Sequence, residues 1–150
     1  MQISSAVFAA EQTIPDTFTC KGPNINPPLS WTEVPEKTQS FILFIEDADA
    51  QPKPWVHWLV FDISGNCREI QEDSIPDGAV EGICNGGTHG YEGPCMKYFS
   101  GTHHYVFHLL ALDTVLKFPD TADKETVLTA AKGHILDVAH LKGIAQGEKK

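Results

Sequence analysis

The alternation of apolar and polar positions is most regular between Thr102 and Leu112. A period of two residues is typical of a β-strand, in which successive side chains point to opposite faces of a sheet. One face of this segment carries His103, Tyr105, Phe107, Leu109 and Ala111, and the other carries His104, Val106, His108, Leu110 and Leu112. We therefore predict a long strand in which His103 and Tyr105 project together near the start.

Two apolar runs precede this segment, an unbroken one from Phe41 to Ile45 and another from Val56 to Ile63 that includes His57 near its start. Such runs predict strands that are buried on both faces. The residues between them are too few for a parallel crossover, which needs about a dozen or more, so the two strands should be antiparallel neighbours. This arrangement would return His57 close to Asp47, and a neighbouring carboxylate would raise the pKa of the imidazole.

The last part of the chain carries the signals of two short helices. Asp120 or Thr121 can cap the first helix, and Gly133 supplies its C-terminal stop. A second short helix is predicted from His134 to Lys142, and residues 147–150 are expected to form a frayed tail. Residues 1–150 should therefore form a single, mainly β domain of two packed antiparallel sheets with two short helices near the C-terminus.

Composition limits the partners and the location. The chain has 150 residues and a formal net charge of −9, which argues against nucleic acid and against anionic membranes as partners. Residues 1–20 lack a basic start followed by an apolar core, and the apolar runs are only as long as strands. We therefore expect no secretory signal, no membrane span and a cytoplasmic location.

The four cysteines, Cys20, Cys67, Cys84 and Cys95, include no Cys-x-x-Cys pair. A reducing compartment would leave all four as thiols. The alternative is a bridge between Cys84 and Cys95 across a glycine-rich loop.

That loop runs from Asn85 to Cys95. It contains Gly86, Gly87, Gly90 and Gly93, which permit positive φ and leave backbone amides unobstructed. Such amides, together with donors from His57, His103 and Tyr105, could surround a small anion. The sequence therefore predicts an anion pocket where the loop meets the strands.

Several short motifs follow one another in a recognisable order over about 110 residues. They read Pro27-Pro-Leu-Ser-Trp31, Asp47-Ala-Asp-Ala50, His57-Trp58, Gly90-Tyr-Glu-Gly-Pro-Cys95, Gly101-Thr-His-His-Tyr105 and Gly133-His-Ile-Leu136. With these motifs the chain resembles the phosphatidylethanolamine-binding protein family, in its short bacterial and archaeal Raf-kinase-inhibitor-like branch.

The resemblance implies a β-sandwich with an anion-binding site. Matched residue by residue, it places Asp47, Asp49, His57, Gly93, His103 and Tyr105 at that site. Animal and plant members bind kinases or other signalling proteins, which implies a signalling partner of unknown identity here. Resemblance to bacterial members is also compatible with a homodimer.

We predict a non-enzymatic binding module for a small anion or phosphorylated ligand, similar to a phospholipid head group, that could modulate a kinase or another signalling protein. The predicted ligand-binding residues are Asp47, Asp49, His57, Gly90, Tyr91, Gly93, Pro94, His103 and Tyr105. We assign no catalytic residue, no metal ligand and no cofactor.

A metal site is the first alternative, because two histidines and one or two acids resemble an open arrangement of two histidines and a carboxylate. The helical spacing His-x-x-x-His is absent. His104 and His108 would lie roughly 13 Å apart along a strand, which is too far for one ion.

A hydrolase is the second alternative. Asp47 or Asp49 could act with His57 as acid and base, or Cys95 could be a nucleophile activated by a nearby histidine. The chain contains no Gly-x-Ser-x-Gly motif and no Walker-type loop to support either mechanism.

The chain departs from the family pattern in two places. Ala48 stands where the family has a proline, so the loop after Asp47 is less restricted in φ. The segment from Met96 to Ser100 is an insertion of about two residues relative to the motif. Tyr98 and Phe99 could cap the pocket, form a dimer contact or admit a different ligand.

Overall fold

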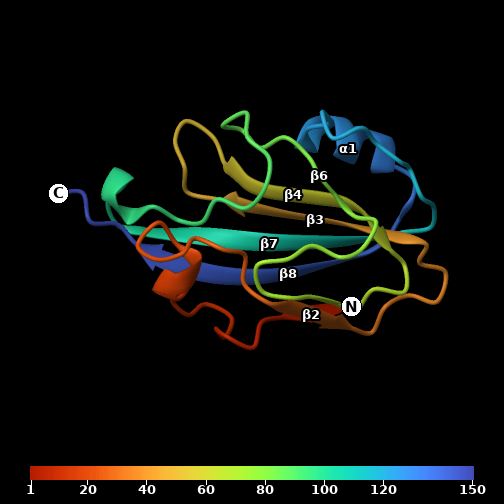
Figure 1. The fold of residues 1–150 in the computed structure, drawn as a ribbon, viewed down its shortest axis with the longest axis horizontal. Coiled ribbons are helices and arrows are strands. Elements are labelled where there is room, and N and C mark those ends of the chain that lie inside the picture. The colour runs from red at the N-terminus through yellow and green to blue at the C-terminus, as the bar shows by residue number, and fades with distance from the viewer.

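The computed structural model describes all residues from 1 to 150 and contains two antiparallel sheets (Figure 1). The larger sheet has the order β6-β4-β3-β7-β8, with β6 at Val80–Glu81, β4 at Trp55–Ser64, β3 at Ser40–Asp47, β7 at Thr102–Leu112 and β8 at Ile135–Gln146. The smaller sheet has the order β1-β2-β5, with β1 at Gln2–Ser4, β2 at Leu29–Thr32 and β5 at Glu69–Ile70. The mainly β fold with two antiparallel sheets is therefore confirmed.

The central strands β3, β4 and β7 form as the hydrophobic pattern predicts. β3 pairs with β4 and with β7, and both pairings are antiparallel. Asp47, the last residue of β3, lies opposite Trp55 of β4 and opposite Tyr105 of β7. These pairings bring three segments that are far apart in the sequence to one end of the sheet.

Each face of the larger sheet has its own hydrophobic core. One core lies between the two sheets and includes Leu43, Trp58 and Phe107, all fully buried. The other lies under helix α1, Lys124–Ala131, and includes Val127 and Phe61. Figure 1 shows α1 and β2 on opposite sides of the larger sheet, so the molecule has three layers.

Only one of the two predicted helices is present. Its N-cap is Asp123, whose side chain accepts a hydrogen bond from the amide of Thr126, rather than Asp120 or Thr121. The expected stop is present, since Gly133 adopts φ of +84° just beyond the helix.

The second helix, predicted from His134 to Lys142, is wrong because this segment forms most of strand β8. Alternate residues of β8, including Ala139, Leu141 and Ala145, are buried against the core between the sheets. Ile135 and Val138, which suggested a helical face, are exposed. Pairing along the whole length of β7 thus overrides a weak helical pattern.

The tail predicted to fray is instead tied to the rest of the chain. The amides of Gly147, Glu148 and Lys149 donate to the carbonyls of Gly101, Met96 and Phe99, at 2.7, 2.9 and 3.0 Å respectively. These bonds hold the tail beside the segment that follows Cys95.

The prediction of four thiols is confirmed for Cys67 and Cys84 and wrong for Cys20 and Cys95. Cys20 and Cys95 form a disulfide, although 75 residues separate them. The backbone brings these segments together, because the amide of Cys20 donates to the carbonyl of Pro94 at 3.0 Å. The alternative bridge between Cys84 and Cys95 is therefore wrong as well, since Cys84 is a free thiol buried in the second core.

No helix of this chain is long and apolar enough to cross a membrane.

Candidate functional site

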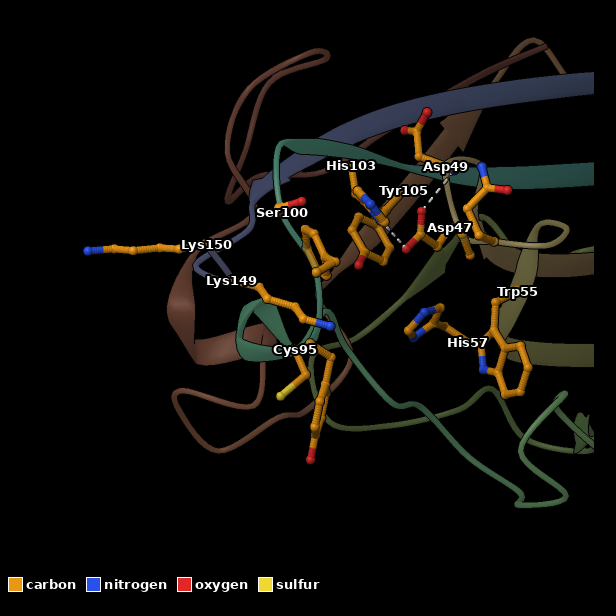
Figure 2. A pocket seen from close by; sticks show the side chains of 14 residues that line it. Asp47, Asp49, Trp55, His57, Cys95, Ser100, His103, Tyr105, Lys149 and Lys150 are labelled. Atoms are coloured by element: carbon orange, nitrogen blue, oxygen red, sulfur yellow. Dashed lines mark hydrogen bonds and ion pairs between the residues drawn. The ribbon is translucent and has the colours of Figure 1, made fainter.

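The largest cavity has a volume of about 650 Å³ and opens where β3 ends and where β4 and β7 begin (Figure 2). It is lined by Asp47, Asp49, Ala50, Gln51, Trp55, His57, Cys95, Tyr98, Phe99, Ser100, His103, Tyr105, Lys149 and Lys150. Five of the nine residues predicted to bind a ligand are in this lining. They are Asp47, Asp49, His57, His103 and Tyr105.

Asp47 and His103 form the most buried polar pair of the cavity. The Nδ1 atom of His103 lies 2.6 Å from Oδ2 of Asp47, and Asp47 is only 4% exposed. Since an ionised carboxylate can only accept, Nδ1 of His103 carries the proton and donates it. The Nε2 atom of His103 has no protein partner, while the ring stacks on Phe99 with a centroid distance of 3.9 Å.

This pairing corrects the prediction for Asp47, which was expected beside His57. His57 instead donates from Nδ1 to the carbonyl of Glu92 at 2.6 Å. Burial, which outweighs this hydrogen bond and the charge of Asp47, lowers the pKa of His57. The expectation of a raised pKa is therefore wrong, and the ring is mostly neutral at pH 7.

A β-bulge explains why His57 points into the cavity. The pairing of β3 with β4 jumps from Ile45 opposite Trp58 to Glu46 opposite Val56, which leaves His57 unpaired. An extra residue in a strand changes the direction in which its side chain points relative to the regular alternation. His57 and Trp58 therefore both face the space between the sheets, and the His57 ring meets Tyr105 edge to face at 5.2 Å.

Tyr105 forms the floor of the cavity and is 1% exposed. Burial, assisted by the negative charge of Asp47, raises the pKa of the Tyr105 phenol. The hydroxyl therefore stays protonated and can donate a hydrogen bond at any physiological pH.

Asp49 lies at the rim and faces outward. Its Oδ2 atom accepts from the amide and from Nδ1 of His104, both at 2.7 Å. Its own amide donates to Oδ1 of Asp47 at 2.9 Å. These bonds fix the turn after β3 without help from the proline that the family pattern has at position 48.

The other four predicted residues, Gly90, Tyr91, Gly93 and Pro94, lie outside the lining. The Tyr91 hydroxyl donates to the carbonyl of Phe18 at 2.7 Å, and the Gly93 amide donates to Oδ1 of Asn24 at 2.8 Å. A Cβ atom on Gly93 would lie 1.9 Å from the carbonyl oxygen of Phe18. The glycine-rich loop therefore packs behind the cavity, and its amides do not form the expected anion nest.

The sequence prediction missed two cationic residues, Lys149 and Lys150. Figure 2 shows Lys149 reaching toward the side of the cavity where His57 lies, while Lys150 points away. No local motif marks these residues, because they reach the cavity only through the hydrogen bonds of the tail.

Three aromatic residues form another part of the wall. Tyr98 and Phe99 come from the inserted segment, as does Ser100, and Trp55 stands at the start of β4. Tyr98 is 71% exposed and Trp55 is 41% exposed. The cavity thus combines an acidic wall, a cationic side and an aromatic rim.

No group of three or more histidine, cysteine, aspartate or glutamate side chains in the chain converges on a position suited to a metal ion. Cys95 is joined to Cys20 and has no thiol to act as a nucleophile.

Comparisons with known proteins identify relatives along almost the whole chain. The profile of the phosphatidylethanolamine-binding protein family matches residues 4–146. A UPF0098 protein of Methanothermobacter thermautotrophicus is 43% identical over 149 residues, which cover 96% of this chain and 97% of that protein.

Two solved structures have the same fold. A phosphatidylethanolamine-binding protein homologue of Chlamydia trachomatis superimposes with a TM-score of 0.91 at 34% identity, covering 98% of this chain and 97% of its own. YbcL of Escherichia coli superimposes with a TM-score of 0.89 at 26% identity, covering 98% of both chains. The present chain therefore belongs to the phosphatidylethanolamine-binding protein family.

Proposed function

We propose that this protein is a non-enzymatic binding module for a small phosphorylated ligand with an anionic end, of the kind found in phospholipid head groups. The observation that carries the proposal is the set of donors around one cavity: His57, His103, Tyr105 and Lys149. Family membership supports ligand binding in general, and the identity of the ligand rests on this cavity alone.

The four groups differ in charge and in when they can donate a hydrogen bond. Lys149 provides a permanent positive charge, and Tyr105 provides a neutral hydroxyl. His57 and His103 each use Nδ1 for a protein acceptor, so Nε2 is the atom left for a ligand. A neutral imidazole presents a lone pair there and becomes a donor only after it takes up a proton. Binding of a phosphate group should therefore draw a proton onto an imidazole.

The acidic wall suits a ligand that also carries a positive group. Asp49 is partly exposed at the rim, while the Asp47 carboxylate already accepts from His103 and from the amide of Asp49. In an ethanolamine phosphate, the ammonium would lie at the rim beside Asp49, whose Oδ1 atom is not used by His104, while the donors face the phosphate. This polarity favours phosphorylethanolamine over inorganic phosphate.

Hydrolysis has less support than binding. Asp47 is committed to His103, His57 is held by a carbonyl, and Cys95 is oxidised. None of the relatives' names indicates an enzymatic activity. A signalling partner, a homodimer and a cytoplasmic location remain predictions.

The proposal is tested by an NMR titration of chelator-treated protein with phosphorylethanolamine at pH 6. We expect saturable amide shifts confined to residues 47–57, 95–105 and 147–150. His103→Gln should weaken binding by about tenfold, whereas the exposed His89→Gln serves as a control and should bind as the parent protein does.

Two outcomes would contradict the proposal. One is the absence of saturable shifts, and the other is a set of shifts that His103→Gln leaves unchanged. Turnover of a phosphomonoester that is lost with His57→Gln would instead support the hydrolase alternative.

A further inference from the structure

A second histidine pair lies on the opposite face of the larger sheet. His108 of β7 and His140 of β8 are directly paired across the two strands. Their Nδ1 atoms share a hydrogen bond of 2.9 Å, and the two rings are nearly perpendicular with centroids 4.8 Å apart. His140 is exposed, whereas the side chain of His108 is 17% exposed.

The ring of His108 is fixed from two directions. It stacks on Phe44 with a centroid distance of 4.4 Å, and its Nε2 atom lies 3.2 Å from Oε1 of Glu46. Glu46 is itself held by Lys124, whose Nζ atom lies 2.8 Å from Oε2. Because a carboxylate accepts, Nε2 of His108 carries the proton, and the lone pair of its neutral ring is on Nδ1.

This order is the one found around metal-bound histidines, which donate their second ring N–H to a carboxylate or carbonyl. The carboxylate fixes the tautomer and the orientation of the ring, so the ligating nitrogen of His108 is already in position before an ion binds. In the metal-free protein, Nδ1 of His140 carries the proton of the hydrogen bond to His108. When an ion binds, this proton is displaced and the ring of His140 can be protonated on Nε2 instead, which leaves the Nδ1 lone pair for the ion.

We propose that His108 and His140 form a binding site for a divalent transition metal ion with tetragonal preference, such as Cu²⁺ or Ni²⁺, completed by water. The separation of the ligand atoms is a hydrogen-bond distance in the metal-free protein, and it also fits this class without movement of the rings. Two metal–nitrogen bonds of about 2.0 Å at a right angle place the nitrogens about 2.8–2.9 Å apart, whereas a tetrahedral angle requires about 3.3 Å.

The charges next to the site are mixed, because Glu46 is paired with Lys124 and Lys142 lies two residues from His140 on β8, whereas the chain as a whole is acidic. The formal charge of the chain is −9, which raises the local concentration of cations. The site has two protein ligands and no third such side chain converges on it, so water has to supply the remaining ligands. The histidine pair lies on the face of the larger sheet that also carries α1, whereas the cavity lies on the face toward the smaller sheet. The metal site is therefore independent of the proposed anion binding.

The test is a titration of the purified, chelator-treated protein with Cu²⁺ alone, followed by electron paramagnetic resonance and by paramagnetic broadening of amide signals. We expect one equivalent to bind, with nitrogen hyperfine structure and broadening centred on residues 106–110 and 138–142. His140→Gln, an exposed substitution that should not disturb folding, should lower the affinity by at least about tenfold.

Two further variants complete the test. Glu46→Ala leaves both ligands in place and should weaken binding by about tenfold, because it removes the acceptor that orients His108. His89→Gln changes another exposed histidine and should have no effect. The proposal is overturned if no copper binds, if broadening centres elsewhere, or if His140→Gln and His89→Gln have equal effects.

Discussion

The carboxylate of Asp47 accepts a 2.6 Å hydrogen bond from Nδ1 of His103 while its other oxygen accepts from the amide of Asp49. One buried side chain therefore orients an imidazole of the cavity and also fixes the turn that follows β3. This double role arises because Asp47 is the last residue of β3 and lies opposite Tyr105 of β7, two residues from His103.

Removal of this carboxylate should destabilise the protein. Asp47→Ala would leave the Nδ1–H of His103 and the amide of Asp49 without their acceptor, at a cost of about 1–3 kcal/mol per buried group. Urea denaturation at pH 7 would measure the free energy of unfolding. The exposed Asp77→Ala is the matched control and should change stability by less than about 0.5 kcal/mol. Equal effects of the two substitutions would show that Asp47 has no structural role.

Much of the fold could be predicted from the sequence because the central strands are strongly patterned. Phe41 to Ile45 is an unbroken apolar run and Val56 to Ile63 is a mostly apolar one, and in the structure both lie in largely buried strands. β8 could not be identified in this way, because its buried positions include Ala139, Gly143 and Ala145, which are weak hydrophobic signals. Its identity as a strand depends on its neighbour β7.

Part of the site could also be predicted from the alternation of side chains along a strand. His103 and Tyr105 share a strand face, so their proximity follows from a period of two residues. The pairing of Asp47 with His103 follows from the register of β3 with β7, in which Asp47 lies opposite Tyr105. The direction of His57 depends on a β-bulge between β3 and β4, which shifts the register by one residue and carries no clear sequence signal. Lys149 and the Cys20–Cys95 disulfide depend on contacts between distant segments.

Lys149 should contribute to anion affinity through its charge. We expect Lys149→Gln to weaken the binding of phosphorylethanolamine severalfold at low ionic strength, and the loss should shrink as salt is added because the interaction is screened. Lys150→Gln removes the same charge from the neighbouring residue, whose side chain points away from the cavity in Figure 2. Isothermal titration calorimetry at two salt concentrations would compare them. Equal losses for both variants would attribute the effect to net charge rather than to a contact of Lys149.

The pH dependence of binding should report on His57. Burial lowers its pKa below the ordinary value of 6.5 in the free protein, and a bound phosphate would raise it. The affinity for phosphorylethanolamine should therefore be constant at pH values above the pKa of His57 in the complex. It should increase as the pH falls from that value toward the pKa of His57 in the free protein. Titration from pH 8 to pH 5 would measure this increase, and His57→Gln should make the profile flatter. A profile of His57→Gln identical to that of the parent protein would assign the dependence to another group.

The network around Glu46 should make the protein sensitive to acid. The hydrogen bond with His108, assisted by Lys124, lowers the pKa of Glu46 to about 2 from an ordinary value of 4.5. Because the folded pKa is the lower one, this carboxylate stabilises the fold fully above pH 4.5, and the contribution is lost as the pH falls from 4.5 to about 2. Because solvent screens the partly exposed carboxylate, Glu46 contributes roughly 2 kcal/mol to the free energy of unfolding, less than the whole pKa shift would give.

Glu46→Gln removes the titrating group and should therefore lose less stability than the parent protein between pH 5 and pH 2.5. The measurement is urea denaturation at several pH values in this range, with the exposed Glu72→Gln as the control that should follow the parent protein. Parallel curves for the parent protein and Glu46→Gln would mean that the carboxylate is not stabilised by its neighbours in the folded state. In that case the orientation of His108 would need another explanation, and the support that Glu46 gives to the proposed copper site would be lost.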